Sequence, residues 1–296
     1  MNNTFKSGYI GIIGVPNVGK STLLNKLAGQ KIAIISAKPQ TTRNKVLAIN
    51  TDDEAQMIFV DTPGFHKPKT KLGESMIKSV DETIADVDLL LLVTEPDENI
   101  SSAESAILEK IGDIPTVLVI NKLDTTERLN LLPVIEKYNE LHKFEDIIPV
   151  SASTGDGVED LKSIIKKYLP EGPMYYPDDM VTDQSEKQIV AELIREKALR
   201  LLNQEIPHGI AVEIVKMKEK GDKVCEISAT IYCEKESHKR IIIGSKGSKL
   251  KAIGSQARVD CEKMLDRKVF LELWVKVKPD WRNSEQMMKE FGMNDL

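Results

Sequence analysis

The residues most able to do chemistry form the run Gly14-Val15-Pro16-Asn17-Val18-Gly19-Lys20-Ser21, which fits G-x-x-x-x-G-K-[ST]. In such a loop, backbone N–H groups face phosphate oxygens, the lysine reaches the β- and γ-phosphates, and the hydroxyl holds Mg²⁺. The sequence therefore predicts a phosphate-binding loop that consists of Gly14, Val15, Pro16, Asn17, Val18, Gly19, Lys20, Ser21 and Thr22.

A second motif indicates which base the nucleotide carries. The run Asn121-Lys122-Leu123-Asp124 follows the apolar stretch 116–120, which is typical of a central parallel strand. The Asp124 carboxylate can accept two N–H groups from guanine, whereas adenine offers no such pair of donors. We therefore expect guanine to be bound by Asn121, Lys122, Asp124 and the backbone of Ser151, Ala152 and Ser153.

A third motif, Asp61-Thr62-Pro63-Gly64, ends the apolar stretch 56–60. Asp61 can hold a metal ion through water, and the Gly64 N–H can contact a γ-phosphate. The next residue is Phe65, whose ring cannot orient a water molecule by hydrogen bonding. We therefore expect either that intrinsic GTP hydrolysis is slow or that another group orients the attacking water molecule.

All of these motifs follow apolar stretches that are expected to be strands, at 9–13, 56–60, 116–120 and 147–150. Open α/β sheets bind their ligands at the carboxyl ends of such strands. The sequence therefore predicts an α/β domain with a mostly parallel central sheet. A small-molecule kinase is an alternative, but the sequence shows no acceptor pocket and no arginine-rich lid.

Composition favours a cytoplasmic protein. The three cysteines, Cys225, Cys233 and Cys261, show no C-x-x-C spacing and are expected to be reduced. No apolar run approaches the ~20 residues that span a bilayer. The net charge of −5 arises in residues 1–170, whereas residues 235–251 carry a local charge of +5.

The second half of the chain begins after a Pro- and Asp-rich stretch, which predicts a domain junction. Its pattern predicts the order α-β-β-α-α-β, with helices over 184–203 and 248–265 and strands over 210–216, 224–233 and 269–277. The predicted domains are 1–170, a linker over 171–183, and 184–296.

An apolar run enters Gly244-Ser245-Lys246-Gly247 and is followed by a helix, which is the signature of a KH domain. Its glycines let a single-stranded nucleic-acid backbone come close, while bases lie in an apolar groove. A helix-turn-helix corner with solvated lysines is the alternative. The sequence shows no exposed aromatic platform. The predicted RNA-binding residues are Lys239, Ile243, Gly244, Ser245, Lys246, Gly247 and Lys249.

On these motifs, residues 7–170 resemble the translation-factor class of GTPases. The resemblance implies that a threonine of the first switch loop coordinates Mg²⁺ and senses the γ-phosphate. Within 38–43, Thr42 is the better match and Thr41 the alternative. It also implies that Asn17 holds K⁺ in place of an arginine finger. The catalytic residues are then Lys20, Thr42, Gly64 and Asn17, and the Mg²⁺ ligands are Ser21, Thr42 and, through water, Asp61.

The whole chain resembles the Era family of bacterial ribosome-associated GTPases, a type II KH domain included, on Ile194-Arg195-Glu196-Lys197, on 272–278 and on Trp281-Arg282. That resemblance implies binding of GTP and GDP and of the 3′ end of 16S ribosomal RNA. It further implies a role in 30S subunit maturation and peripheral contact with the inner membrane. Nothing in the sequence demands more than a monomer. An RNA-binding scaffold with a merely structural nucleotide is the remaining alternative.

Overall fold

The computed structural model describes residues 4–36, 38, 41–65, 68–126, 131–202, 209–220 and 224–293. The chain divides into two compact units, and each is described by itself. The first unit contains residues 1–33, 42–68 and 75–183. The second unit contains residues 34–41, 69–74 and 184–296.

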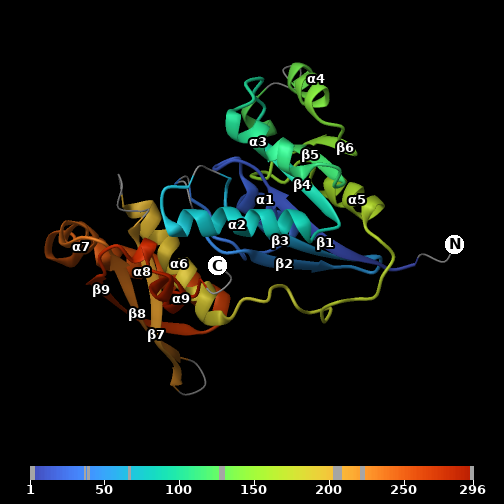
Figure 1. Ribbon diagram of the computed structural model, residues 1–296. Coiled ribbons are helices and arrows are strands. Elements are labelled where there is room, and N and C mark those ends of the chain that lie inside the picture. The colour runs from blue at the N-terminus through green and yellow to red at the C-terminus, as the bar shows by residue number, and fades with distance from the viewer. Residues whose placement is uncertain are drawn as a thin grey trace. The chain divides into compact units, whose positions relative to one another are not determined.

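The first unit is built on a six-stranded sheet with the order β2-β3-β1-β4-β5-β6 (Figure 1). Only β2 and β3 pair antiparallel, and every other neighbouring pair is parallel, which confirms the predicted mostly parallel α/β fold. The strands are β1 (Lys6–Ile13), β2 (Val46–Thr51), β3 (Ala55–Asp61), β4 (Leu89–Thr94), β5 (Thr116–Ile120) and β6 (Asp146–Pro149).

Helices cover both faces of this sheet. The side chains of α1 (Lys20–Leu27) and α5 (Val158–Tyr168) share one core with the sheet. The side chains of α2 (Lys71–Ala85), α3 (Ser102–Ile111) and α4 (Leu131–Leu141) share the other. Because both faces are covered, every residue of β4 and β5 is buried, and this explains their unbroken apolar sequences.

The predicted linker is tied to the first unit by hydrogen bonds. The Ile49 N–H donates to the Val181 carbonyl over 2.9 Å, and the Thr182 hydroxyl donates to the Leu47 carbonyl over 2.7 Å. These contacts lie along β2, which is an edge strand with unpaired backbone groups. The stretch therefore covers an edge of the sheet.

The second unit follows the predicted order α-β-β-α-α-β. Its three-stranded sheet has the order β7-β8-β9, with β7 antiparallel and β9 parallel to β8. The elements are α6 (Glu186–Leu201), β7 (Ala211–Lys220), β8 (Val224–Cys233), α7 (Glu236–Ile243), α8 (Ser248–Leu265), β9 (Lys268–Val277) and α9 (Glu285–Glu290).

Two details of the second unit differ from the sequence expectations. Strand β7 runs to Lys220 instead of Lys216, past a register irregularity between Ile214 and Lys216. The sequence also predicts a turn at Lys220-Gly221-Asp222, of which Gly221 and Asp222 lie outside the described residues. Helix α9 is an addition, and it begins where the Ser284 hydroxyl accepts the Met287 N–H.

The three cysteines are free and buried in the core of the second unit. Burial raises the pKa of each thiol, and it raises the pKa of Cys261 to about 12. They pack as small apolar side chains, as the sequence predicted.

Candidate nucleotide site and RNA-binding surface

The predicted phosphate loop joins β1 to α1, and two of its glycines are required by close neighbours. Gly14 has φ of +150°, and a Cβ there would lie 2.3 Å from the Val93 carbonyl oxygen. Gly19 has φ of +98°, and a Cβ there would lie 2.2 Å from the Asn121 side-chain nitrogen. The loop can take this shape only because both side chains are absent.

Lys20 opens helix α1, and its side chain turns back over the loop. Its Nζ donates to the carbonyls of Gly14 and Val15, each over 2.9 Å. Burial lowers the pKa of Lys20 to about 8, and nearby Asp61 opposes that shift. The loop therefore holds one buried ammonium group beside N–H donors of the helix N-terminus, which suits phosphate.

Three oxygen-bearing side chains from separate elements meet beside the loop. The Ser21 hydroxyl lies 2.9 Å from the Thr42 hydroxyl and 2.8 Å from Asp61 Oδ2, and Thr42 lies 3.3 Å from the same carboxylate oxygen. Burial raises the pKa of Asp61 to about 6. Among the described residues, its buried Oδ1 has no hydrogen-bond partner. A half-buried oxygen cluster with a free carboxylate oxygen fits a hard cation such as Mg²⁺.

The two threonines of the 38–43 stretch differ in orientation. The Thr42 hydroxyl lies in the oxygen cluster, whereas the Thr41 hydroxyl donates to the Lys38 carbonyl over 2.6 Å. This geometry favours Thr42 as the metal ligand. Pro39 and Gln40 of the same stretch lie outside the described residues.

Asn121 ties together the loops that follow β1, β5 and β6. Its Nδ2 donates to the Val18 carbonyl over 2.8 Å, and its Oδ1 accepts the Ala152 N–H over 2.9 Å. Asn121 is buried, so these bonds hold the loops without competition from water. Its part in the site is to position the other two loops.

Asp124 is exposed near the 151–153 loop. Its Oδ1 accepts a hydrogen bond of 2.5 Å from the Ser151 hydroxyl, and this bond holds the pKa of Asp124 below its usual value. Ser153 lies 3.0 Å from the Ser151 hydroxyl, and Lys122 pairs with Glu95. Asp124 is therefore an ionised acceptor, as guanine recognition requires.

The Asp61–Gly64 motif packs against the phosphate loop. A Cβ on Gly64 would lie 2.9 Å from the Pro16 Cα, and the buried Thr62 hydroxyl donates to the Ile12 carbonyl over 2.9 Å. The Phe65 N–H donates to Gly14, while the Phe65 ring packs on the core under α2–α4, with the Lys110 Nζ 5.4 Å from its centre. The Phe65 ring therefore serves packing, while its backbone lies against the phosphate loop.

Asn17 is exposed at the tip of the loop, with φ of +70°. Asparagine tolerates this left-handed conformation better than most residues do, so the loop itself accounts for its presence. The remaining predicted nucleotide-site residues, Pro63 and Thr22, lie on the Asp61–Gly64 motif and on the first turn of α1.

In the second unit, α7 ends at Ile243, which packs on the core, and the G-x-x-G loop leads into α8. Gly244 has φ of +73°, and a Cβ there would lie 2.8 Å from the Lys249 Cβ. Gly247 has φ of +78° and open space around it, with no atom within 4 Å of a built Cβ. Gly244 thus allows close packing on α8, while Gly247 leaves room for another chain.

The other predicted RNA-binding residues surround this loop. Ser245 and Lys246 are exposed, and Lys246 has φ of +49°. Lys239 on α7 and Lys249 on α8 are half-buried. The structure therefore brings the expected cationic side chains to one end of α8.

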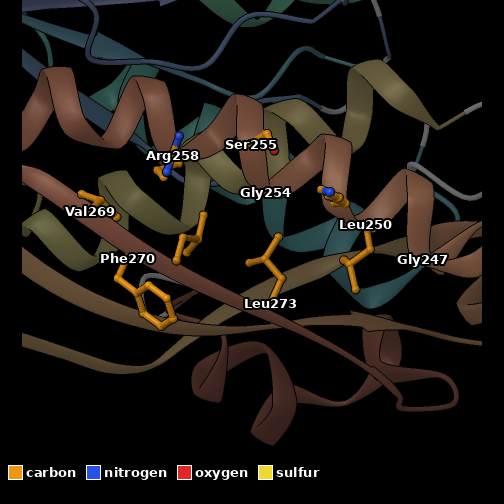
Figure 2. Close-up of a pocket in the computed structure, with 10 residues that line it drawn as sticks. Gly247, Leu250, Gly254, Ser255, Arg258, Val269, Phe270 and Leu273 are labelled. Carbon is orange, nitrogen blue, oxygen red and sulfur yellow. The ribbon is translucent and has the colours of Figure 1, made fainter.

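A groove of about 470 Å³ runs beside α8 and β9, which is an edge strand of its sheet (Figure 2). Leu273 points from β9 toward α8, and Gly254 leaves space there, since its Cβ would lie 3.3 Å from Leu273. The groove is lined by Gly247, Leu250, Lys251, Gly254, Ser255, Arg258, Val269, Phe270, Leu271 and Leu273.

Two features of this surface differ from the sequence expectations. The cationic rim extends beyond the predicted residues, since Lys251 and Arg258, seven residues apart, are exposed on one side of α8. Phe270 and Trp274 are 55% and 61% exposed, so the expectation of no exposed aromatic platform was wrong. Both side chains lie on the face of β9 opposite its apolar face. The Phe270 ring lies across the strand from Leu273 (Figure 2).

Comparison with models of known protein families supports the assignment of each unit. A family model described as a 50S ribosome-binding GTPase matches residues 9–122, and a KH domain model matches residues 205–282. The fold and the two sites thus define a P-loop GTPase joined to a KH domain.

The full-length relatives are more specific. GTPase Era of Clostridium kluyveri is 53% identical over 289 residues, which is 97% of this chain and 99% of the relative. GTPase Era of Clostridium botulinum is 51% identical over 294 residues, which is 99% of each chain. This chain belongs to the Era family of GTPases.

A solved structure has the same fold over nearly the whole chain. Era in complex with MgGDPNP and nucleotides 1506–1542 of 16S ribosomal RNA matches with a TM-score of 0.94 and 42% identity. The match covers 97% of this chain and 99% of that one.

Proposed function

We propose that this chain is a GTP-hydrolysing switch that binds 16S ribosomal RNA near its 3′ end and acts in maturation of the 30S subunit in the cytoplasm. The observation that carries this proposal is its similarity, over 97% of the chain, to Era solved with MgGDPNP and a 16S RNA fragment. Filter binding tests the RNA half. We expect preference for a 3′-terminal 16S oligonucleotide over a scrambled one, and equal binding would contradict it.

The nucleotide roles are divided among the strand ends. We propose that residues 14–22 and Asp61–Phe65 hold the phosphates and that Ser21, Thr42 and, through water, Asp61 hold Mg²⁺. When bound, Mg²⁺ neutralises charge on the β- and γ-phosphate oxygens. The free Asp61 oxygen among two hydroxyls supports this arrangement. Asn121, Lys122, Asp124 and residues 151–153 complete the site around guanine.

The guanine assignment predicts a change of base preference. In Asp124→Asn, one carboxylate acceptor becomes a donor, so affinity for GTP should fall by about 100-fold and xanthosine triphosphate should be preferred. Competitive nucleotide binding measures both effects. Asp156→Asn, an exposed change beyond the 151–153 loop, is the control and should bind as the parent does. Unaltered GTP affinity in Asp124→Asn would show that the base lies elsewhere.

Catalysis is proposed to use Lys20, Thr42, the Gly64 N–H and Asn17. Phe65 leaves no side chain at its position to orient water, so a K⁺ ion held by Asn17 is proposed to supply the positive charge. An arginine finger in that role is worth about 10³–10⁵ in rate.

The K⁺ proposal predicts that single-turnover GTP hydrolysis is faster in potassium chloride than in sodium chloride at equal ionic strength. In Asn17→Ala the difference should vanish. Asn17→Gly is the matched control for loop shape, because glycine keeps φ of +70° without strain. If the two salts give equal rates with the parent protein, Asn17 does not hold a catalytic cation.

The RNA roles follow from the surface of the second unit. We propose that the RNA backbone passes over Gly244–Gly247, with Lys239, Lys246 and Lys249 beside its phosphates and Ile243 and Ser245 at the loop. Bases would enter the groove between α8 and β9, whose apolar wall includes Leu250 and Leu273. Lys251 and Arg258 extend the cationic rim along the helix.

We also propose that the protein is a monomer, since nothing in the sequence demands more, and that it makes peripheral contact with the inner membrane, which rests on the family resemblance. Within the described parts of the chain, no helix is long and apolar enough to cross a bilayer.

A further inference from the structure

The outer face of strand β9 is open along its whole length. Alternate residues of β9, from Val269 to Val277, pack on the core of the second unit. The residues between them point to the opposite face of the sheet, because successive side chains of a strand alternate. All of these outer side chains are exposed, and they are Lys268, Phe270, Glu272, Trp274 and Lys276.

Two of these exposed side chains are large aromatic rings on an edge strand. Phe270 and Trp274 are four residues apart on one face, which places them about 13 Å apart at 3.3 Å per residue. Natural proteins usually protect an edge strand from contact with other chains, since an exposed apolar edge favours aggregation. Two exposed rings on such an edge therefore indicate a partner that covers them.

The groove beside α8 leads to these rings. Leu271 and Leu273 line the groove from the inner face of β9, and Phe270 lines it from the outer face. Figure 2 shows the Phe270 ring on the far side of the strand from Leu273. The groove and the outer face thus meet over the edge of β9, and a chain that leaves the groove across this edge reaches Phe270 first.

The charges on the outer face suit a nucleic acid at the ends of β9. Lys268 and Lys276 are exposed on either side of the two rings. On β8, Glu226 lies beside Phe270 and is paired with two lysines of β7 over 3.1 and 2.8 Å. Glu272 is exposed between the rings, and a phosphate group should avoid it. Phosphates therefore fit at the two lysines, and bases fit over the rings.

We infer that Phe270 and Trp274 form a stacking platform for unpaired bases of an RNA segment that leaves the groove over the edge of β9. The inference rests on the proposed passage of RNA through that groove. Stacking on aromatic rings tolerates any base, because every base has a π-face. The platform therefore adds affinity outside the groove without adding base specificity.

The binding test compares the full-length parent with Trp274→Leu and Trp274→Phe, in one nucleotide state throughout. The probes are the 3′-terminal 16S oligonucleotide and two longer forms of it, with about six adenosines added at the 5′ or the 3′ end. Trp274→Leu should bind the form that crosses β9 about 10-fold more weakly than the parent does. Trp274→Phe keeps a ring and should retain most of the affinity.

A matched control comes from the opposite edge of the same sheet. Val215 on β7 is 59% exposed, close to the 61% of Trp274. Val215→Ala should bind all three probes as the parent does. Phe270→Leu should weaken binding in the same direction as Trp274→Leu, so the platform can also be tested at a second position.

Tryptophan fluorescence gives a readout that a structural role would not change. The chain has two tryptophans, and Trp274 is exposed whereas Trp281 is fully buried. A base that stacks on the indole of Trp274 should quench its emission at saturating RNA. The same titration should leave Trp274→Phe nearly unchanged, because only Trp281 emits there. Unchanged emission of the parent at saturation would contradict stacking.

The outcomes separate the platform from the proposed RNA path beneath it. If Gly247→Asp keeps parental RNA affinity, RNA does not follow the groove and the inference fails with that proposal. If Gly247→Asp loses affinity while Trp274→Leu binds all three probes as the parent does, only the platform is overturned. A protein partner would then be the occupant of the outer face of β9.

Discussion

Lys20→Ala should lower the affinity for both GDP and GTP by about 10³-fold. The Lys20 ammonium is buried in the loop, and removal of one partner of a buried charge pair costs about 3–5 kcal/mol. Isothermal titration with GDP measures the loss. Lys26→Ala, an exposed change on the same helix α1, should bind GDP as the parent does. A loss of less than about ten-fold in Lys20→Ala would contradict the phosphate-loop assignment.

The same variant should keep its RNA affinity, because the two units have separate cores. The full-length chain is the correct material for this control. A fragment that starts at residue 184 would lack Ile34, which is buried in the core of the second unit.

The second large effect concerns RNA. Gly247→Asp should weaken binding of the 3′-terminal 16S oligonucleotide by about 100-fold, since it places a carboxylate where phosphates are proposed to pass. The built Cβ meets no atom within 4 Å, so the change adds no clash, and aspartate tolerates φ of +78° better than most residues other than glycine do. Gly244→Asp should also abolish binding, but its Cβ would collide with Lys249 and disturb the start of α8.

Gly292→Asp is a close control for Gly247→Asp. Gly292 belongs to the same unit, has φ of +77°, and likewise has no atom within 4 Å of a built Cβ. It should retain parental RNA affinity. Lys246→Ala should lower the salt slope by roughly 0.7 for the lost phosphate contact. GTP binding should be unchanged in all of these variants, and unchanged RNA affinity in Gly247→Asp would contradict the proposed passage of the RNA backbone over Gly244–Gly247.

Much of the nucleotide site could be predicted because short motifs encode it at known places in the fold. The loop at Gly14–Ser21, Asp61, Asn121 and Asp124 each follow an apolar run, and parallel strands bring the carboxyl ends of such runs to one edge of the sheet. Gly14 and Gly19 also have positive φ, which glycine adopts more readily than other residues do, so the residue type itself indicates the backbone conformation there.

The parts that could not be predicted depend on long-range packing. Neither charge nor periodicity indicates that Ile35 and Thr41 form hydrogen bonds with residues of α6 more than 150 positions away, or that Arg195, Glu196 and Lys197 are buried. The sequence likewise does not distinguish Thr41 from Thr42 as the metal ligand, because both residues carry a hydroxyl in one polar stretch. The direction of each hydroxyl distinguishes them.

In the second unit, the exposed aromatic residues of β9 and the groove beside α8 could not be predicted from the sequence. The alternation along β9 identifies its apolar face, but it does not reveal that the opposite face is open enough to expose Phe270 and Trp274. The groove beside α8 arises from two elements whose pairing depends on the whole unit. The sequence of neither α8 nor β9 alone therefore predicts that the groove lies next to Gly247.

The proposal of a GTP-hydrolysing, RNA-binding switch is tested by single-turnover hydrolysis of GTP in Mg²⁺, measured with the 3′-terminal 16S oligonucleotide and without it. We expect inorganic phosphate to be released from GTP and not from ATP, while the same protein binds the oligonucleotide. Transfer of the phosphate to a small acceptor would instead indicate a kinase. GTP that stays bound and uncleaved, with RNA and without it, would contradict a hydrolysing switch and leave an RNA-binding scaffold.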